Sequence, residues 1–531
     1  MKNPVPFLVL GLLMVLIPVA ASAGETVEFP QGVRLEIRSA DGRVDIHHTR
    51  LVTLSVSEGE DPTPFLPAGP FSATWTGHIN VDLRDRFRFG FQGNGTFQFF
   101  IDGRVRLEAD SRDPESLVGR RARLGKGPNA FVATYQSPAT GVAECRLMWE
   151  STEFPMETVP ATVLTRFLEP SIVWGLMYRE GRELFAEYRC LKCHQPEKDF
   201  EEVGRPMLEL LEDAPSFETI ASRTRDEWIP FWLESPQRLY PDSPMPRILH
   251  GPDAAQNAVD IAAYFESLNA ESQSEIEGEA DEGKSLFDQL GCIGCHTLTA
   301  EERENDSFDR IPLDHIPAKW KSSGELSEFL QDPQSHFESI RMPNFKLTIE
   351  EANDLATFLM DRKKEPLDPI QGNPMRGEDL VGALRCLNCH GEEKDADASA
   401  PSFETIRSKE GVGCLSIEAT EDRRAPLFPL TQDEIGAIQS FLKSGETESL
   451  NQSDPVETSE RYIRKLRCNA CHERDGHFDV WTLLNPPEEP EEDFEGDLSD
   501  PEVDQSRPSL TFVGEKLRPD WLAKRLKGEV G

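Results

Sequence analysis

Basic charge and long apolar runs are both scarce in this sequence. The 531-residue chain has 56 Lys and Arg residues against 95 Asp and Glu residues, which gives a formal net charge of -39. This balance argues against nucleic-acid binding, which needs a basic footprint. It favours either a solvated surface or attraction to a basic partner. Beyond the N-terminal segment no apolar run is long enough to cross a bilayer, so we predict no further membrane span.

Cysteines outside a repeated motif are few, and recognisable catalytic constellations are missing. We find no pattern typical of a dehydrogenase, peroxidase or oxidase. Eight of the ten cysteines occur in four Cys-x-x-Cys-His motifs, and only Cys145 and Cys414 remain. Paired cysteines in an exported chain would first suggest disulfides. The histidine that follows each pair favours a different chemistry.

The first residues have the pattern of an export signal. Lys2 supplies a positive start, residues 7–19 are apolar, and Ala21-Ser22-Ala23 is a small-residue cleavage pattern. We therefore predict a signal peptide over residues 1–23 and a periplasmic or otherwise exported bacterial protein. An uncleaved anchor is the alternative, although the apolar run is short for a span.

Residues 24–170 have the pattern of an all-β sandwich. Apolar residues alternate over 87–91, and residues 96–101 read as a second strand followed by a hairpin turn at Asp102-Gly103. Further strands are expected at 130–135 and 144–149. Closely spaced short strands separated by turns are typical of a sandwich. Within it we expect Cys145 to behave as a small buried hydrophobe.

From about residue 174 the pattern becomes helical and repeats four times, with one motif in each repeat. The segment Pro215 to Ile220 recurs almost unchanged as Pro401 to Ile406. A repeat of this size with its own motif indicates an array of domains. We place the domains at 174–270, 280–365, 372–446 and 456–531. The acidic stretch 486–506 is predicted to be a flexible loop within the last one.

The four motifs have the spacing that covalent haem attachment requires. Two thiols form thioethers to the two haem vinyl groups, and the adjacent imidazole then binds the iron from one face. Zinc binding and thiol redox chemistry are the competing interpretations, but neither requires a histidine directly after each pair. We predict four covalent haem c groups. The attachment residues are Cys190, Cys193, Cys292, Cys295, Cys386, Cys389, Cys468 and Cys471, and the iron ligands are His194, His296, His390 and His472.

Each motif follows an amphipathic segment, and this arrangement resembles class I cytochrome c domains. The resemblance implies a second axial ligand from a methionine, followed by a closing helix packed on the opening one. Met245 and Met342 lie in Met-Pro contexts before such helices, so they are the candidate ligands of the first and second haem. A core methionine is the alternative for either. The family also implies a downstream proline carbonyl that accepts from each histidine. Pro215, Pro312, Pro401 and Pro508 are the candidates.

The third and fourth units depart from this pattern. Ala425 occupies the position of the axial methionine in the third unit, so its haem is expected to be open or to recruit Cys414 or Met375. In the fourth unit residues 517–522 resemble the helix before the methionine, but the sequence ends at Gly531. We therefore expect the last domain to be truncated as given.

The N-terminal region resembles the PA14 family in Phe71 to Gly77, Ile101-Asp102-Gly103 and Phe131 to Tyr135. The resemblance implies a β-sandwich that binds carbohydrate or a protein. Sugar-binding members hold calcium with adjacent aspartates, whereas this chain has Gly93-Asn94-Gly95 at the expected turn. We expect Trp75, Tyr135 and Trp149 to be core residues rather than a sugar platform.

The predicted function is electron transfer through four haems between a periplasmic donor and an acceptor protein. Two alternatives stay open. One is a haem enzyme or a gas or redox sensor that uses the open third haem, and the other is binding of carbohydrate, cell wall or a partner through the PA14-like domain. An electron carrier or a subunit of a redox enzyme is favoured over a stand-alone catalyst.

Overall fold

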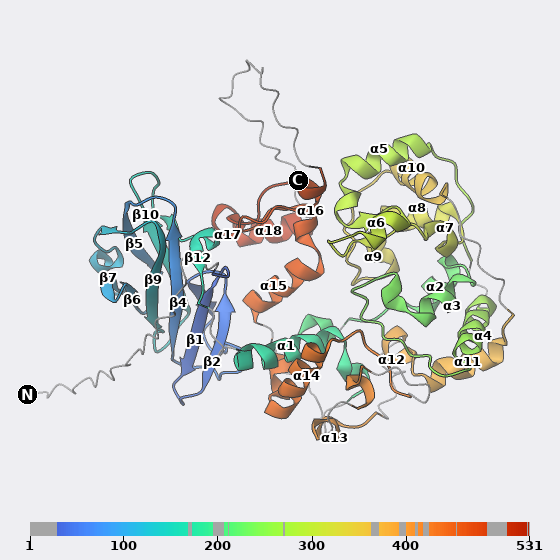
Figure 1. Ribbon diagram of the computed structural model, residues 1–531, viewed down its shortest axis with the longest axis horizontal. Helices are drawn as coiled ribbons and strands as arrows, with labels where there is room; N and C mark the ends of the chain where they lie inside the picture. Colours follow the sequence, from blue (N-terminus) through green and yellow to red (C-terminus); the bar gives the residue numbers. More distant parts are fainter. Residues whose placement is uncertain are drawn as a thin grey trace, which may run out of the picture.

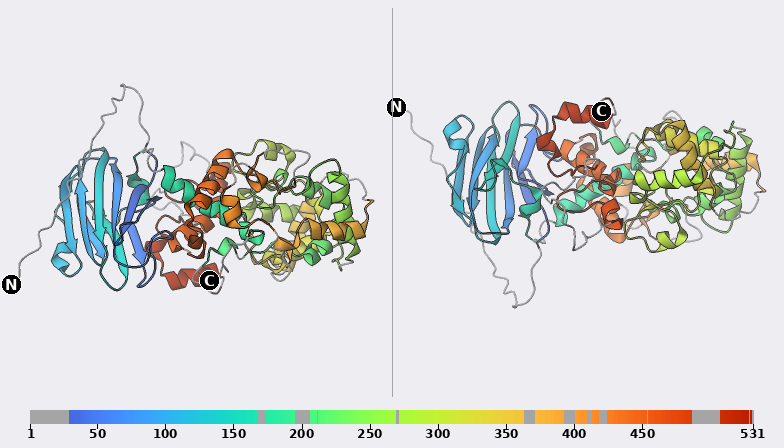
Figure 2. Two further views of the ribbon diagram at one scale, coloured as in Figure 1. Left: turned by 90° about the horizontal axis from the view of Figure 1, so that it is seen from below. Right: turned by 90° about the horizontal axis from the view of Figure 1, so that it is seen from above.

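The computed structural model describes residues 29–167, 173–194, 206–210, 212–268, 271–362, 371–391, 400–408, 412–417, 424–452, 454–485, 507–527 and 529. The signal peptide predicted at 1–23 and the acidic loop predicted at 486–506 lie outside these residues. The described chain forms a β-sandwich at one end and a larger helical part at the other (Figure 1, Figure 2).

Two antiparallel sheets make the sandwich. The larger sheet has the strand order β2-β1-β4-β9-β6-β7 with β12 added on β4, and the smaller has the order β11-β10-β5-β8 with β3 added on β10. The strands are β1 (Val33–Ser39), β2 (Val44–Thr49), β3 (Thr53–Val56), β4 (Phe71–Val81), β5 (Arg86–Gly93), β6 (Thr96–Ile101), β7 (Arg104–Asp110), β8 (Ala122–Arg123), β9 (Gly127–Gln136), β10 (Ala143–Glu150), β11 (Glu157–Thr158) and β12 (Leu164–Thr165).

Aromatic side chains from both sheets fill the space between them. Phe91 of β5 stacks on Phe97 of β6 with ring centroids 5.1 Å apart. Burial of apolar rings on alternating strand positions is the main stabilising contribution of such a core. Trp75 and Tyr135 are fully buried and Trp149 is nearly so, which confirms their prediction as core residues. Cys145 is buried as predicted.

The two turns predicted between residues 93 and 103 have different roles in the fold. Asp102-Gly103 joins β6 to β7 as a hairpin, as predicted. The turn at 93–95 instead carries the chain from one sheet to the other, because β5 pairs with β10 whereas β6 pairs with β9. Gly93 has a φ of 146°, and a Cβ there would lie 2.1 Å from the Glu144 carbonyl oxygen, so only glycine fits.

Helices make up about half of the remaining described chain. They are α1 (Val173–Glu187), α2 (Phe217–Arg223), α3 (Trp228–Glu234), α4 (Ala254–Ser267), α5 (Ala280–Gln289), α6 (Ala300–Glu304), α7 (Ile316–Lys319), α8 (Ser323–Gln331), α9 (Pro333–His336), α10 (Ile349–Met360), α11 (Pro374–Ala383), α12 (Leu387–His390), α13 (Phe403–Arg407), α14 (Gln432–Ser444), α15 (Pro455–Lys465), α16 (Val480–Leu484), α17 (Val513–Lys516) and α18 (Pro519–Leu526). Two short strands, β13 (His296–Thr297) and β14 (Ile311–Pro312), pair in parallel.

Side-chain caps explain where several of these helices begin. Thr348 and Thr431 each accept from the backbone N–H of the glutamate three residues later, and that glutamate accepts from the backbone N–H of the threonine. These reciprocal bonds form capping boxes at Thr348–Glu351 and Thr431–Glu434. They fix the starts of α10 and α14, which are the closing helices of their repeats.

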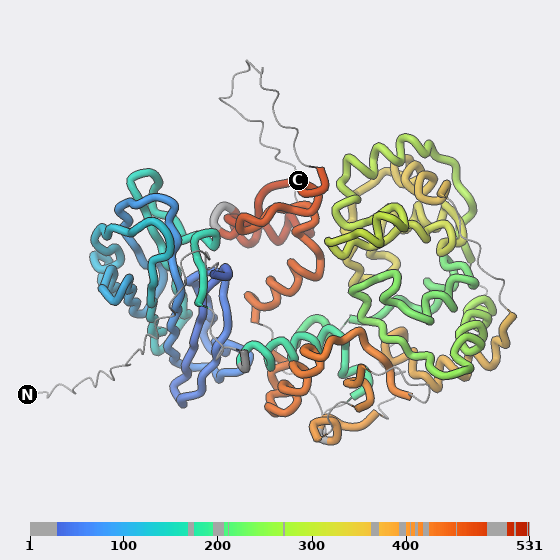
Figure 3. Tube along the Cα trace, viewed as in Figure 1, coloured from blue at the N-terminus to red at the C-terminus, as the bar shows by residue number. Residues whose placement is uncertain are grey.

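The helices assemble into four lobes, each numbered by the motif that it contains. Lobe 2 is continuous in sequence and consists of α5 to α10, with α5 packed on α10. Lobe 4 consists of α15 to α18. Lobe 1 combines α1 with α13 and α14, and lobe 3 combines α11 and α12 with α2, α3 and α4. In Figure 3, α1 and the distant α14 lie side by side.

Lobes 1 and 3 are therefore interleaved. The opening helix of the first repeat packs on the closing helix of the third, and the opening helix of the third repeat packs on the closing helix of the first. The sequence ranges 174–270 and 372–446, which were each expected to close on themselves, both contribute to both lobes. The closing helices α4 and α14 are similar enough that either can receive a similar opening helix.

Glycine makes each of these helix crossings possible. A Cβ at Gly181, Gly283 or Gly377 would lie 2.0–2.1 Å from a backbone carbonyl oxygen of the closing helix. The oxygens belong to Ala437 for Gly181, Asp354 for Gly283 and Asp260 for Gly377. Each glycine lies equally far before the first cysteine of its motif. The same crossing therefore forms in lobes 1, 2 and 3, whether or not its helices are close in sequence.

The four lobes contact one another in the order 1, 3, 2, 4 and back to 1. Asn388 of lobe 3 donates to the Lys192 carbonyl of lobe 1 at 2.8 Å. Trp228 of lobe 3 stacks on His315 of lobe 2 with ring centroids 4.8 Å apart. Lobes 2 and 4 meet through their motifs, and Arg464 of lobe 4 reaches Glu183 of lobe 1 at 3.1 Å.

Two buried arginines on α1 join lobe 1 to its surroundings. Arg179 pairs with Asp45 on β2 and with Glu457 on α15, so it connects the sandwich and lobe 4. The Arg182 side chain is fully buried. It donates to the Ser449 carbonyl at 2.9 Å, to the Gln452 carbonyl and to the Glu457 carboxylate at 3.0 Å. Burial lowers the pKa of Arg182 to about 9, yet these acceptors face it as a cation.

Candidate functional site: four Cys-x-x-Cys-His motifs

Each motif begins at a backbone reversal that ends the opening helix. The residue before the first cysteine has a left-handed conformation in all four motifs, with φ values of 53°, 75°, 59° and 53° at Arg189, Gly291, Arg385 and Arg467. Three of these residues are arginine, for which this conformation costs about 1–2 kcal/mol. Its recurrence at the same position shows that the motif requires the reversal.

A tight turn then holds the two cysteines of each motif. The N–H of the second cysteine donates to the carbonyl of the first, over 3.1–3.3 Å in all four motifs. The histidine N–H also donates to the first cysteine's carbonyl at 2.9–3.0 Å in lobes 1, 3 and 4. In lobe 2 His296 instead enters β13, and Ile311 on β14 donates to the Cys295 carbonyl at 2.8 Å. The thiols and the imidazole are thus held together by the backbone.

Every motif histidine is oriented by a carbonyl oxygen on its Nδ1. The acceptors are Pro401 for His194 at 2.7 Å, Ile311 for His296 at 3.1 Å, Pro215 for His390 at 2.8 Å and Pro508 for His472 at 2.9 Å. An Nδ1–H donor leaves Nε2 as the nitrogen that can bind a metal ion. Two thiols and one oriented imidazole are the donor set that covalent haem attachment needs, so the residues fit the predicted group.

These acceptors partly match the predicted proline carbonyls. Pro508 accepts within its own repeat, and in lobe 2 the acceptor is the residue before Pro312. Pro215 and Pro401 both serve, but each accepts from the histidine of the other repeat. Pro215 shortly precedes α2, which packs in lobe 3, and Pro401 shortly precedes α13, which packs in lobe 1. The exchange of prolines therefore has the same cause as the exchange of helices.

Burial keeps two of the imidazoles neutral. It lowers the pKa of His296 to about 4, with a smaller opposing contribution from the Ile311 carbonyl. Burial also lowers the pKa of His390, and the Phe217 ring stacks on that imidazole with centroids 5.2 Å apart. Neutral imidazole is the form that binds a metal ion.

The two candidate methionine ligands lie in loops that are held in the same way. Gln237 donates to the Met245 carbonyl at 2.6 Å, and Gln334 donates to the Met342 carbonyl at 3.2 Å. Met342 packs against the apolar core of lobe 2, which includes Cys292. The Met245 sulfur accepts from the Trp232 indole at 3.1 Å. Their roles as iron ligands stay predictions.

The alternatives considered for the Ala425 site lie in different surroundings. Met375, on the first turn of α11, has a relative exposure of 77%. Cys414 lies in a short 3-10 turn, Gly413–Leu415, and the adjacent Leu415 packs against the same apolar core as Cys190 of the first motif. Cys414 therefore lies near a motif, but near that of lobe 1 rather than that of lobe 3.

The motifs are arranged in two close pairs. In lobes 1 and 3 the Asn388 amide bonds the Lys192 carbonyl and lies 3.7 Å from the Cys193 sulfur. In lobes 2 and 4 a Cβ at Gly294 would lie 2.7 Å from the Ala470 carbonyl oxygen. Both contacts join the third residue of one motif to the third residue of the other. Sequence reasoning missed this pairing, because no local pattern reports which motifs meet.

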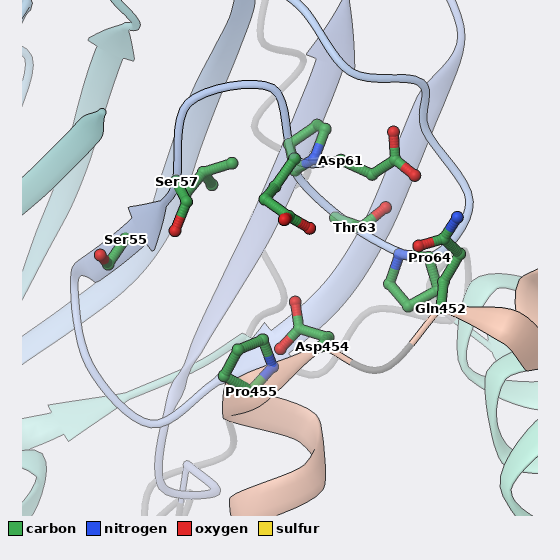
Figure 4. Close-up of a pocket in the computed structure, with 11 residues that line it drawn as sticks. Ser55, Ser57, Asp61, Thr63, Pro64, Gln452, Asp454 and Pro455 are labelled. Atoms are coloured by element: carbon green, nitrogen blue, oxygen red, sulfur yellow. The ribbon is translucent and has the colours of Figure 1, made fainter. Parts of the chain in front are cut away.

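A separate small cleft lies between the sandwich and the segment leading into lobe 4 (Figure 4). It has a volume of about 60 Å³ and its lining includes Asp61, Thr63 and Asp454. No motif residue lines it, and it is too small for a porphyrin. We assign it no function.

Membrane-spanning helices and clusters of metal-binding side chains are both absent from the described residues. No helix among them is long and apolar enough to cross a bilayer. Within the same residues no group of three or more His, Cys, Asp and Glu side chains is arranged to hold a metal ion.

Residues 280–363 match the family model of cytochrome c. This match covers lobe 2, which is continuous in sequence. It supports a haem-binding, electron-transferring domain there. A comparison with curated protein sequences gave no match.

Similar solved structures include an anti-sigma factor domain-containing protein from Clostridium clariflavum, a PA14 sugar-binding domain from an RTX adhesin and the PA14 domain of MpAFP antifreeze protein. Their identities are 15%, 16% and 7%, and their TM-scores are 0.23, 0.22 and 0.22. The matches cover 26%, 26% and 28% of this chain, and 48%, 99% and 99% of those chains. This chain thus spans about half the length of the anti-sigma factor protein. Such low TM-scores carry no argument, and carbohydrate or partner binding by the sandwich stays a prediction.

Proposed function

We propose that this chain is an exported electron-transfer protein that carries four covalent c-type haems in two close pairs. The observation that carries the proposal is the fourfold recurrence of one local geometry. Each motif has a left-handed residue, a cysteine turn and a histidine whose Nδ1 donates to a carbonyl. Lobe 2, which matches cytochrome c, is one of the four.

Haem iron supplies a one-electron oxidation and reduction, with a potential that depends on axial ligands and burial. The protein's part is to hold the motifs at fixed separations and to exclude water from them. Direct contact between the third residues of paired motifs brings the attachment cysteines of two lobes together. Electrons can then pass within a pair without a diffusing carrier.

The contact order of the lobes suggests a route for electrons. Lobes 1 and 3 form one pair and lobes 2 and 4 the other, while lobe 3 also contacts lobe 2 through Trp228 and His315. The Arg225 backbone N–H adds a bond to the Lys319 carbonyl at 2.8 Å between the same lobes. The partners would be a redox donor and an acceptor protein. The net charge of -39 favours basic surfaces on both.

Haem counting tests the proposal directly. The full chain is expressed in a bacterium that attaches c-type haem, and its intact mass and pyridine haemochrome spectrum are measured. We expect four haems per chain. Replacing both cysteines of any one motif with alanine should remove one haem. Cys145→Ala and Cys414→Ala are the matched controls and should leave four.

Two results would overturn the proposal. One is a chain that carries a single haem, in lobe 2 alone. The other is bound zinc in place of haem at the remaining motifs. A reductive titration gives a further check. The sites with methionine should be reduced at relatively high potential, and only strongly negative potentials would contradict their assignment.

A further inference from the structure

We infer that Ala425, which occupies the position of the axial methionine in its repeat, faces the haem attached at Cys190 and Cys193, and that Met245 serves the haem attached at Cys386 and Cys389. This inference rests on the proposed function. It reverses the pairing expected from sequence order, in which Met245 faces His194 and Ala425 faces His390. Three independent sets of contacts carry it.

The first set is at the histidines. His194 is oriented by Pro401, and His390 is oriented by Pro215 and covered by Phe217. The carbonyl that orients each histidine therefore comes from the other repeat. Since a motif and the carbonyl that orients it belong to one haem site, each of these two sites combines both repeats.

The second set is in the apolar cores. Cys386, Leu387 and Val381 belong to one core with Ile229 and Phe265 of the first repeat. Cys190, Leu191 and Leu184 belong to another core with Phe403 and Phe441 of the third repeat. The apolar surroundings of the motif in lobe 3 thus come mainly from the first repeat, and those of the motif in lobe 1 come from both repeats.

The third set is in the loops that carry the sixth-ligand position. Leu249, shortly after Met245, packs in the core that holds Cys386. Phe428, shortly after Ala425, lies edge-on to Tyr188 with ring centroids 5.4 Å apart, next to Cys190. The loops meet where Arg247 and Leu427 exchange two backbone hydrogen bonds, at 3.0 and 2.8 Å, and then diverge into their separate lobes.

The consequence is chemical. An alanine methyl group cannot bind iron, so lobe 1 offers a sixth position to a small neutral ligand, whereas lobe 3 has a histidine and a methionine. The site proposed to react with ligands is therefore built from His194, Pro401 and Ala425. Leu415, the residue after Cys414, packs against the same apolar core as Cys190. Small neutral molecules such as carbon monoxide are the ligand class that an open ferrous haem binds.

Carbon monoxide titration of the full-length reduced chain tests the assignment. The number of molecules bound per chain is compared between the parent and two variants, Cys190→Ala/Cys193→Ala and Cys386→Ala/Cys389→Ala. We expect the first variant to bind one fewer and the second to bind the same number. Loss of one molecule in the second variant, with none lost in the first, would overturn the inference.

A cross-linking measurement covers variants that fail to fold or to load haem. A Cβ at Gly436 on α14 would lie 3.7 Å from the Met177 side chain on α1. Met177→Cys/Gly436→Cys should therefore be joined by a short bis-maleimide, as read by peptide mass spectrometry. Met177→Cys/Val259→Cys is the matched control, because Val259 on α4 and Gly436 on α14 each directly precede the residue whose carbonyl meets the crossing glycine.

The results separate two kinds of failure. Linkage at 259 instead of 436 would overturn the interleaved arrangement while leaving the four haems intact. A parent chain without four haems would instead refute the proposed function. The variant Ala425→Met adds a gain-of-ligand readout. It should lower carbon monoxide binding by one molecule in the Cys386→Ala/Cys389→Ala background, and have no effect in the Cys190→Ala/Cys193→Ala background. The reverse pattern would contradict the assignment.

Discussion

Lobe 2 closes on its own repeat, whereas lobes 1 and 3 close on each other. All three use the same parts, which are a glycine at the helix crossing, a left-handed residue before the motif and a carbonyl on the histidine. The difference teaches that these parts specify a contact between surfaces and not a contact between neighbours in sequence. A comparison of lobe 2 with the interleaved pair therefore separates what the local motif determines from what chain connectivity determines.

The largest effect is expected from Arg182→Ala, which removes a buried cation from the interleaved pair. The Glu457 carboxylate would keep Arg179 but lose its second buried cation, and the Ser449 and Gln452 carbonyls would lose a charged donor. Breaking a buried ion pair costs about 3–5 kcal/mol. Denaturant unfolding should show this loss in lobe 1, while the transition of lobe 2 stays unchanged.

The control for this change is Arg464→Ala, since Arg464 forms an exposed pair with Glu183. Its effect should stay within about 0.5 kcal/mol. Equal destabilisation of lobe 2 by Arg182→Ala would mean that the lobes unfold as one unit, and the comparison would lose its basis.

Gly377→Ala should have the next largest effect, because its methyl group would overlap the Asp260 carbonyl of α4. Overpacking of this kind costs about 1–3 kcal/mol. Gly382→Ala on the same helix meets nothing within 4 Å. That change should be neutral or stabilise the helix by up to about 1 kcal/mol.

The carbon monoxide spectrum of the reduced chain shows which haem site each glycine variant alters. Gly377→Ala should open the haem at His390 and leave the one at His194 unaltered. Gly283→Ala should produce the same defect within lobe 2 alone. Damage to the His194 site from Gly377→Ala would contradict the packing of α11 on α4.

Asn388→Ala should weaken the contact between lobes 1 and 3 without affecting lobes 2 and 4. The lost hydrogen bond to the Lys192 carbonyl contributes about 1 kcal/mol. We expect slower electron exchange within this pair, measured by the rate at which the two haems equilibrate after rapid reduction. Asn305→Ala is the control, because that amide bonds only the Glu301 carbonyl of its own helix. Equal slowing in both variants would exclude a specific role for Asn388.

The smallest effect is a weakening of the joint between the sandwich and lobe 1 in acid. Burial by itself would raise the pKa of Asp45, but Arg179, His47 and the Thr63 hydroxyl outweigh it, so the net shift is downward. Its stabilising contribution is present above the ordinary value of 3.8 and is lost as pH falls through the lowered pKa.

Protonation of His47 also lowers stability in acid, but it does so over a higher pH range than Asp45. Burial, reinforced by Arg179, lowers its pKa from 6.5 to about 3, so the unfolded chain binds the proton more readily between those values. Stability therefore falls as pH decreases from about 6.5. His47→Gln should remove that part of the pH dependence of sandwich unfolding and leave the part below 3.8. An unchanged profile in this variant would contradict the assignment.

Much of the fold was predictable because its signals are local. The strand pattern at 96–101 and the Asp102-Gly103 turn predict β6 and its hairpin with β7. The Thr-x-x-Glu patterns that begin at Thr348 and Thr431 mark the starts of α10 and α14. The eight motif cysteines and four histidines have a spacing that is rare by chance. Their roles in binding haem stay predictions.

The partners of α1 and α11 were not predictable in the same way. The closing helices α4 and α14 both present a carbonyl to a glycine and follow similar loops, so either satisfies the local pattern. The choice depends on Arg182, which is held by residues 449–457, and on Asp260, which accepts from the Asn373 backbone at 2.8 Å. Such contacts join residues far apart in the chain, and no periodicity in the sequence records them.

The glycine crossing of α1 with α14 also sets an order of events during synthesis. N-terminal segments of a chain are made and fold first, so α1 and its motif are available long before α14 exists. The whole of lobe 2 is produced in the interval and can close at once, since its own crossing of α5 with α10 is local. The first motif must stay in an unfinished half-domain until the third repeat arrives, which delays its closure and prolongs the time for which its apolar surface is exposed.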